Sequence, residues 1–199
     1  MLAKVRHTLA QRISKIPTAL LVKTGLSPNA LTLFGFAVTL GVAWVLSTGR
    51  FFLGGFLVLF SGAFDFLDGA LARATGRSTK FGAFLDSTLD RFSDAALFLG
   101  LLAYYASLGS HYTEIVLIGA ALTGSLATSY ARARAEGLGL KDEVGLFTRT
   151  ERIVLLAIGL IVGHWYGNAI TVVLWIIAVL SNFTALQRIY HVWRQTGGK

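Results

Sequence analysis

The sequence predicts an all-α integral membrane protein, in which an N-terminal amphipathic interfacial helix precedes six transmembrane helices and both termini are cytoplasmic. Three observations predict this fold. The 199-residue chain has a mean hydropathy of +0.65 and is only 14% charged, whereas soluble domains carry about 25% charged residues. Six long apolar segments are joined by short polar links. Lys and Arg are concentrated in alternate links rather than spread along the chain.

The six apolar segments define the predicted transmembrane helices. A helix needs roughly 20 apolar residues to cross the ~30 Å hydrocarbon core, and the segments that meet or approach this length are residues 30–48, 51–74, 81–108, 112–137, 152–166 and 169–193. Membrane-spanning strands are excluded, because no segments of about ten alternating residues occur. We expect one domain over residues 1–199, with the six-helix bundle at 30–193.

The first 16 residues alternate apolar and basic positions. Apolar residues recur at spacings of three or four, with cations between them, at Leu2, Val5, Leu9, Ile13 and Ile16. This pattern predicts a helix that lies in the headgroup plane against anionic lipid. The alternative is an ordinary cytoplasmic helix packed on the bundle.

The distribution of cations predicts the orientation of the chain. Lys and Arg cluster before the first predicted helix, in the second and fourth links and in the tail, whereas the first, third and fifth links hold only Arg50. Since cytoplasmic links carry the excess of Lys and Arg, both termini are expected in the cytoplasm of a multi-pass cell-membrane protein. The net charge of +8 is then a topological signal, and we expect no nucleic-acid partner.

Five of the ten acidic residues lie toward the cytoplasmic ends of the second and third predicted helices, namely Asp65, Asp68, Asp86, Asp90 and Asp94. Their spacings of three and four place each set on one helical face, and the short basic link makes the two helices antiparallel neighbours. An ionisable group at the bilayer centre costs at least about 2.5–3.5 kcal/mol and usually has a partner. A functional role is therefore expected for the set.

Carboxylates that converge in a low dielectric repel one another strongly, and divalent cations would neutralise them. All-oxygen ligands favour Mg²⁺ or Mn²⁺ over softer metals. The alternative is a set of structural ion pairs with the nearby cations, which are Arg73, Arg77, Lys80 and Arg91. The four histidines are scattered, with no metal-ligand spacing between them, and Cys is absent, which excludes thiolate ligands and nucleophiles.

Eight residues between positions 65 and 90 form a recognisable series, which reads Asp65, Asp68, Gly69, Ala72, Arg73, Gly82, Asp86 and Asp90. This series resembles the signature of the CDP-alcohol phosphotransferases, integral membrane enzymes of phospholipid synthesis, at every fixed position. The resemblance extends to the six predicted helices and to residues 27–32 at the start of the first one. It implies a transferase that moves a phosphatidyl-type group from a CDP-linked lipid to an alcohol and releases CMP.

The resemblance also implies roles for individual residues. Two divalent ions would be held against the diphosphate by Asp65, Asp68, Asp86 and Asp90, and Asp90 would also be the general base. The CDP-lipid would contact Asn29, Ala30, Leu31, Thr32, Gly69, Arg73 and Thr79. Arg73 could instead pair with Asp68 on its own helix. Asp94 lies outside the signature, and we expect it to act indirectly or structurally.

The acceptor is predicted from the cations behind this signature. Arg152 and Arg188 lie near the cytoplasmic ends of the fifth and sixth predicted helices, and Arg suits bidentate phosphate binding. The stretches 129–136, 149–152 and 187–193 resemble those of bacterial phosphatidylinositol phosphate synthases. That match implies CDP-diacylglycerol and inositol 1-phosphate as substrates, with the phosphate held by Arg132, Arg152 and Arg188. Arg132 replaces the Lys that is frequent in these enzymes, so another polyol phosphate stays open.

The sequence is also compatible with several alternatives. Phosphatidylglycerophosphate synthases, which use glycerol 3-phosphate, share the main signature. In another class, a divalent-cation carrier would use the same acids as a permeation site, although the far helix ends carry no matching polar track. An inactive lipid-binding relative is a third possibility. The family further implies a homodimer, for which the third and fourth helices offer small residues at Gly100, Gly119 and Gly124.

Overall fold

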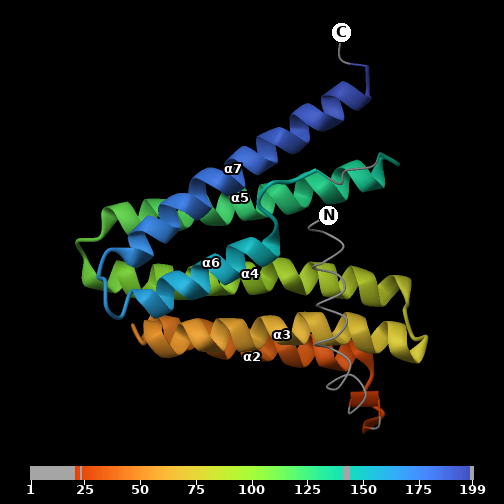
Figure 1. Ribbon diagram of the computed structural model, residues 1–199, viewed down its shortest axis with the longest axis horizontal. Helices are drawn as coiled ribbons and strands as arrows, with labels where there is room; N and C mark the ends of the chain where they lie inside the picture. Colours follow the sequence, from red (N-terminus) through yellow and green to blue (C-terminus); the bar gives the residue numbers. More distant parts are fainter. Residues whose placement is uncertain (1–20, 23, 141–143, 198–199) are drawn as a thin grey trace.

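The computed structural model describes residues 21–22, 24–140 and 144–197. Six long helices make up this part of the chain (Figure 1), and they are α2 (Pro28–Ser47), α3 (Phe51–Thr75), α4 (Lys80–Leu108), α5 (Tyr112–Gly137), α6 (Arg149–Val162) and α7 (Ala169–Gln195). The all-helical prediction is confirmed. The predicted amphipathic helix at residues 1–16 lies outside the described residues.

Local sequence signals explain where the helices that carry the signature begin and end. Ser27 caps α2, because its Oγ accepts a hydrogen bond from the backbone N–H of Ala30 at 3.2 Å. Helix α3 ends at Gly76, whose φ of 63° is the left-handed conformation that glycine adopts without strain. Thr79 then caps α4, since its Oγ1 accepts from the Gly82 N–H at 2.9 Å. The end of α3 at Gly76 and the start of α4 after Thr79 thus fix a very short α3–α4 turn.

Five of the six predicted segments agree with the observed helices to within two residues at each end. The exception is the fifth, which was predicted at 152–166 and occurs at Arg149–Val162. Its start moves back because Thr148 and Glu151 form a capping box, in which the Thr148 N–H donates to the Glu151 carboxylate at 2.7 Å. The shift places Arg149 inside the helix rather than in the preceding link.

Four helices of the described chain, α2, α3, α5 and α7, are long and apolar enough to cross a membrane. Helix α4 has the length, but three of the acids and Arg91 lie along it. Helix α6 has 14 residues and spans only about 21 Å at 1.5 Å per residue. The structure therefore confirms a membrane-type helical bundle, and the crossing of all six helices stays a prediction.

The packing of the helices leaves room between the two acidic faces. Helix α2 packs against both α3 and α4, α3 packs against α6, and α7 packs against α5 and α6 (Figure 1). Helices α3 and α4 are joined by a short turn, but they are not closely packed on each other in the described structure. This differs from the simple neighbouring pair expected from sequence, and it separates the acidic faces enough for other groups to lie between them.

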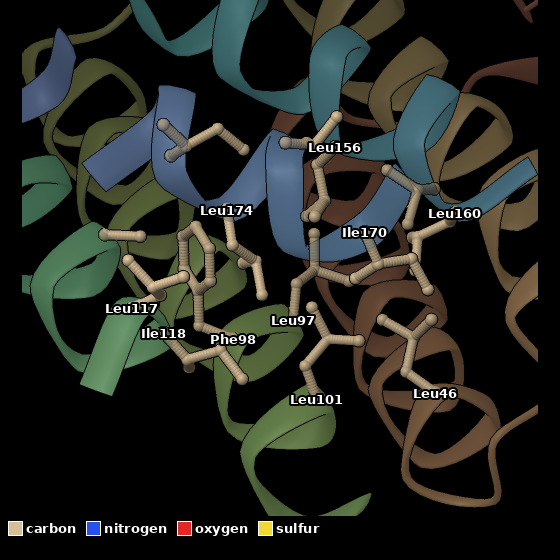
Figure 2. Packing of buried hydrophobic residues seen from close by; sticks show 14 of the residues in the cluster. Leu46, Leu97, Phe98, Leu101, Leu117, Ile118, Leu156, Leu160, Ile170 and Leu174 are labelled. Atoms are coloured by element: carbon tan, nitrogen blue, oxygen red, sulfur yellow. The ribbon is translucent and has the colours of Figure 1, made fainter. Parts of the chain in front are cut away.

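The apolar core lies farther from the α3–α4 turn than the acids do. Figure 2 shows Leu97, Phe98 and Leu101 of α4 packed among side chains of α5, α6 and α7. Leu101, Leu160 and Leu174 are fully buried. Because this core begins one turn beyond Asp94, it anchors the same helix that carries the acids.

Two of the glycines expected at a dimer interface are used inside the chain. A Cβ on Gly100 would lie 2.3 Å from the Ala43 carbonyl oxygen of α2, and one on Gly124 would lie 2.6 Å from the Asn182 side chain of α7. These positions therefore allow close helix packing within one molecule. Gly119 has open space beside it. The suggestion that Gly100 and Gly124 form a dimer contact was wrong.

Candidate active site

The four predicted metal ligands lie on the facing sides of α3 and α4. Asp65 and Asp68 belong to α3, and Asp86 and Asp90 belong to α4. Their charges act on one another across the two helices, as Asp86 repels both acids of α3 and Asp90 repels Asp65. The helices thus concentrate four negative charges in one place, as the spacing predicted.

Asp68 is the most enclosed of the four, with 4% of its surface exposed. Its Oδ2 accepts a hydrogen bond from Thr32 Oγ1 of α2 at 2.7 Å, and its Oδ1 accepts from the Gly69 N–H at 2.6 Å. Thr32 and Gly69 were both predicted to contact the CDP-lipid. In the structure they fix the orientation of this carboxylate.

Arg149 of α6 lies among the carboxylates. Its Nη1 is 2.7 Å from Asp65 Oδ2 and 2.9 Å from Asp90 Oδ1, and its Nε is 2.9 Å from Asp94 Oδ1. One guanidinium therefore joins α3, α4 and α6. The sequence did not single out Arg149 as a site residue. The available signal was its spacing of three from Arg152, which places both on one face of α6.

Asp94 connects the cluster to the neighbouring helices. It is 3% exposed, and its Oδ2 accepts from Ser125 Oγ of α5 at 3.0 Å and lies 3.4 Å from Arg152 Nη2. With the Arg149 contact, this one carboxylate has partners on α5 and α6. The expectation that Asp94 acts indirectly agrees with these contacts, because its partners are other side chains of the site.

A small cavity of about 170 Å³ opens beside Asp68 and is called here the small cavity. It is lined by the ends of α2, α3 and α4, including Asn29, Thr32, Gly69, Arg73, Thr79, Gly82 and Asp86. The missing side chain of Gly82 matters here, since a Cβ would lie 2.9 Å from Asn29 Oδ1 and 3.0 Å from Thr79 Oγ1. Five of the seven predicted CDP-lipid residues line this space, while Ala30 and Leu31 do not.

A second cavity of about 410 Å³, called here the large cavity, lies on the other side of the acids. Its lining comes from α4, α5, α6 and α7 and includes Asp86, Asp90, Asp94, Arg132, Arg149, Arg152 and Arg188. Asp86 lines both cavities. Asp68 lines only the small cavity and Asp90 only the large one, so the boundary between the two spaces runs through these three acids.

The three predicted acceptor cations all line the large cavity, at different depths. Arg152 and Arg188 are 2% and 5% exposed, whereas more than half of the Arg132 side chain is exposed. Arg132 Nε pairs with Glu136 at 2.8 Å, and Arg188 Nη1 donates to the Thr128 carbonyl at 3.4 Å. Arg152 and Arg188 thus form the buried floor, and Arg132 forms the rim.

The alternative ion pairs expected from the sequence do not form. Within residues 24–140 and 144–197, none of Arg73, Arg77, Lys80 and Arg91 makes an ion pair with the five aspartates, and the partners of these acids are Arg149 and Arg152. Arg73 lines the small cavity instead of pairing with Asp68. The acids are therefore not explained by neighbouring cations of the α3–α4 turn.

The donor chemistry of the cluster fits hard divalent ions. All four predicted ligands are carboxylates, the ligand type that Mg²⁺ and Mn²⁺ prefer, and the cation that contacts them is a single guanidinium. As the side chains are placed, no three Asp, Glu or His residues of the described chain form a metal-ligand group. Arg149 Nη1 lies where Asp65 and Asp90 approach each other.

These features define a class of protein, a helical membrane-type bundle with a polyanionic cluster between a small cavity and a large cationic one. The comparisons with known proteins agree with it. Residues 25–184 match the family model described as CDP-alcohol phosphatidyltransferase. The chain belongs to this family and is a phosphatidyltransferase.

Individual relatives are similar over nearly the whole chain. A phosphatidylinositol phosphate synthase of Mycobacteroides abscessus is 38% identical over 196 residues, which cover 96% of this chain and 88% of the relative. An archaetidylinositol phosphate synthase of Methanothermobacter thermautotrophicus is 38% identical, with 87% and 86% covered. The crystal structure of the Mycobacterium tuberculosis phosphatidylinositol phosphate synthase with CDP-DAG bound superimposes with a TM-score of 0.85 at 36% identity, covering 92% of this chain and 94% of that one.

Proposed function

We propose that this protein transfers the phosphatidyl group of CDP-diacylglycerol to inositol 1-phosphate, giving phosphatidylinositol phosphate and CMP. One observation carries the choice of a phosphorylated acceptor. Arg132, Arg152 and Arg188 line the same large cavity as Asp90. Arg152 and Arg188 are almost fully buried there, and guanidinium groups suit bidentate binding of a phosphate, an interaction that a neutral acceptor would not make.

The relatives support the same substrates. Relatives that match over most of the chain include phosphatidylinositol phosphate synthases, and the tuberculosis enzyme has been crystallised with CDP-DAG. The archaeal relative is named for an inositol phosphate product with a different lipid. Because inositol phosphate is common to these names, it is the favoured acceptor, ahead of glycerol 3-phosphate.

The cluster of Asp65, Asp68, Asp86 and Asp90 would hold two divalent ions, Mg²⁺ or Mn²⁺. Such ions neutralise the charge on the diphosphate and on the departing CMP. A structure of the tuberculosis relative was determined in complex with manganese and citrate, which supports a divalent site in the family. Asp68, fixed by Thr32 and Gly69, would be the best ordered of the ligands.

Asp90 would act as the general base for the acceptor. An acceptor hydroxyl attacks the phosphorus that carries the diacylglycerol, its new O–P bond forms, and the P–O bond to CMP breaks. The hydroxyl proton passes to Asp90, and the bridging oxygen leaves with CMP. Asp90 lines the large cavity and faces Asp65 across Arg149. It thus stands between the acceptor space and the acids of α3.

The small cavity would receive the cytidine diphosphate part of the lipid. Its walls are formed by Asn29, Thr32, Gly69, Arg73 and Thr79, and Ala30 and Leu31 are proposed to act through the backbone of the same turn. Arg73, which has no ion pair in the described chain, is available for a phosphate oxygen. Asp86 lines both cavities, so the diphosphate would lie where they meet.

The same proposal covers the topology. All six helices would cross the cell membrane, with both termini and both cavities at the cytoplasmic side, as the Lys and Arg distribution predicts. The short α6 would reach only part of the way, with its polar start at the level of the cluster. We further propose a homodimer, as the family resemblance implies. The cation-carrier alternative has no support, because the chain is a phosphatidyltransferase.

The proposed reaction is tested by an acceptor panel. Purified protein is incubated with CDP-diacylglycerol and Mg²⁺, and CMP release is measured with inositol 1-phosphate, glycerol 3-phosphate, inositol and serine. The fastest release is expected with inositol 1-phosphate, and release at least about 10³-fold slower with D90N. If CMP release were faster with glycerol 3-phosphate, glycerol 3-phosphate would be the acceptor instead of inositol 1-phosphate. If no acceptor gave CMP release, the proposed reaction would be refuted.

A further inference from the structure

The side chain of Arg149 has two sets of partners with different roles. One end, Nη1, contacts Asp65 at 2.7 Å and Asp90 at 2.9 Å, which are two of the proposed ion ligands. The other end, Nε, contacts Asp94 at 2.9 Å, which is outside the proposed ligand set. A single guanidinium therefore connects the ion-binding acids to an acid that is free of that task.

A guanidinium and a divalent ion would use the same oxygen atoms. Asp65 Oδ2 and Asp90 Oδ1 cannot accept a close Arg149 Nη1 and bind a dication at the same point, because two cations would then lie within contact distance. Both charges are only partly screened there, since Arg149, Asp65 and Asp90 are each about one quarter exposed. Occupation by one cation therefore opposes occupation by the other.

Asp94 provides the place to which Arg149 can withdraw. It is 3% exposed and held from two directions, by Ser125 of α5 and by Arg152 of α6. Its contact with Arg149 Nε does not involve Nη1, so it can persist after Nη1 leaves Asp65 and Asp90. Arg149 also lines the large cavity, and withdrawal keeps its charge on the acceptor side of the cluster.

We propose that Arg149 is a resident counter-ion of the aspartate cluster, which competes with divalent ions for Asp65 and Asp90 and is retained by Asp94 when they bind. This inference rests on the proposed function, because that function assigns the ions to these acids. Arg149 is a positioning residue in this scheme. It acts on the reaction through the acids that it holds.

The test measures Mn²⁺ binding without any lipid or acceptor, by titration calorimetry on detergent-solubilised protein. R149Q is expected to bind Mn²⁺ at least about tenfold more tightly than the wild type. The matched control is R91Q, which removes a cation that acts on Asp86 but contacts neither Asp65 nor Asp90. R91Q is expected to change the affinity less than about threefold. If both variants raised the Mn²⁺ affinity equally, the loss of a nearby positive charge would explain the change, and the proposed competition would be overturned.

A second variant tests the role of Asp94. D94N is expected to weaken Mn²⁺ binding at least about threefold, because Arg149 loses its alternative anchor and stays on Asp65 and Asp90. In the R149Q background the same change should have no effect on Mn²⁺ affinity, since the competing group is gone. An equal loss in both backgrounds would show that Asp94 acts independently of Arg149 and would overturn its assigned role.

Thermal melting checks that the variants fold. R149Q should melt lower than the wild type in EDTA and should gain more from saturating Mn²⁺. If R149Q does not fold, R149K takes its place, with a gain in Mn²⁺ affinity of at least about threefold expected. Unchanged Mn²⁺ affinity in the folded variant overturns the competition alone. A wild type that binds no Mn²⁺ overturns the metal site of the proposed function as well.

Discussion

The small and large cavities share Asp86 as a lining residue but are built from different materials. The small cavity is walled by glycines, hydroxyls and the Asn29 amide around the buried Asp68, and its two arginines, Arg73 and Arg77, are exposed. The large cavity is walled by guanidinium and carboxylate groups, of which Arg152, Arg188 and Asp94 are almost fully buried. One space suits close approach by a planar base and its phosphates, and the other suits a compact anion.

The difference also lies in how each cavity is encoded. The small cavity is built from residues 28–32 and 68–86, two short stretches on consecutive helices. The large cavity gathers residues from 86 to 188 on four helices. Its charges depend on packing between α5, α6 and α7 that no local pattern reveals. A short signature can therefore identify the reaction class, while the acceptor depends on distant parts of the chain.

The largest effect is expected at Asp90, in the large cavity. D90N replaces the proposed base with an amide that cannot take the acceptor proton, and it also weakens an ion ligand. We expect a loss of at least about 10³-fold in kcat, in line with the 10²–10⁴-fold range of general base catalysis. CMP release at saturating concentrations of both substrates measures it.

The control for D90N is another acid-to-amide change on a helix of the same bundle. Glu114 lies at the opposite end of the bundle, where it accepts from Thr171 Oγ1 at 2.8 Å. E114Q should keep kcat within about twofold of the wild type, since Glu114 contacts neither cavity. A D90N enzyme with more than a tenth of the wild-type kcat would refute the assignment of Asp90 as base.

The next largest effect is expected from a change in the large cavity that alters the kinetics for the acceptor but not for CDP-diacylglycerol. R188Q removes a buried cation from the floor of the large cavity, and a charge-assisted hydrogen bond is worth about 1.5–3 kcal/mol. At 1.4 kcal/mol per tenfold, kcat/KM for inositol 1-phosphate should fall about 10–150-fold, while KM for CDP-diacylglycerol stays within about twofold. Steady-state kinetics with each substrate varied in turn measure this split.

The rim of the same cavity supplies a graded comparison. Arg132 is more than half exposed and already paired with Glu136, so R132Q should cost less than R188Q, about fivefold in kcat/KM, because exposed charges are screened. A larger loss for R132Q than for R188Q would reverse the proposed depth of the acceptor phosphate. Equal losses for both substrates in R188Q would point to misfolding rather than to the large cavity.

Substitution of a glycine in the small cavity should alter the kinetics for CDP-diacylglycerol but not for the acceptor. A Cβ at Gly82 would lie 2.9 Å from Asn29 Oδ1, so G82A must displace that side chain into the small cavity. KM for CDP-diacylglycerol is expected to rise about tenfold, equivalent to about 1.4 kcal/mol, with KM for inositol 1-phosphate unchanged. G41A is the control, because Gly41 of α2 has open space around it. If G82A and G41A behave alike, the small cavity does not bind the CDP-lipid.

The sequence predicted the elements that depend on local chemistry. Hydrophobic length placed five helices to within two residues, and the aspartate spacing predicted one shared acidic face. It misplaced α6 because the capping box at 148–151 competes with an apolar run that continues to residue 166. It missed the ion pairs of Arg149 with Asp65, Asp90 and Asp94, because α6 reaches these acids only through packing on α3. The spacing of Arg149 and Arg152 indicates a shared face of α6, but it does not indicate which acids that face meets.

The smallest effect should come from a single hydroxyl. T32V removes the 2.7 Å hydrogen bond that orients Asp68 and keeps the shape of the side chain. One such bond is worth about 1 kcal/mol, so KM for CDP-diacylglycerol should rise roughly fivefold without any change for the acceptor. T39V is the matched control, since Thr39 lies on α2 with its Oγ1 donating to the Gly35 carbonyl of the same helix. Equal shifts for T32V and T39V would mean that α2 stability, and not the orientation of Asp68, controls binding of the lipid nucleotide.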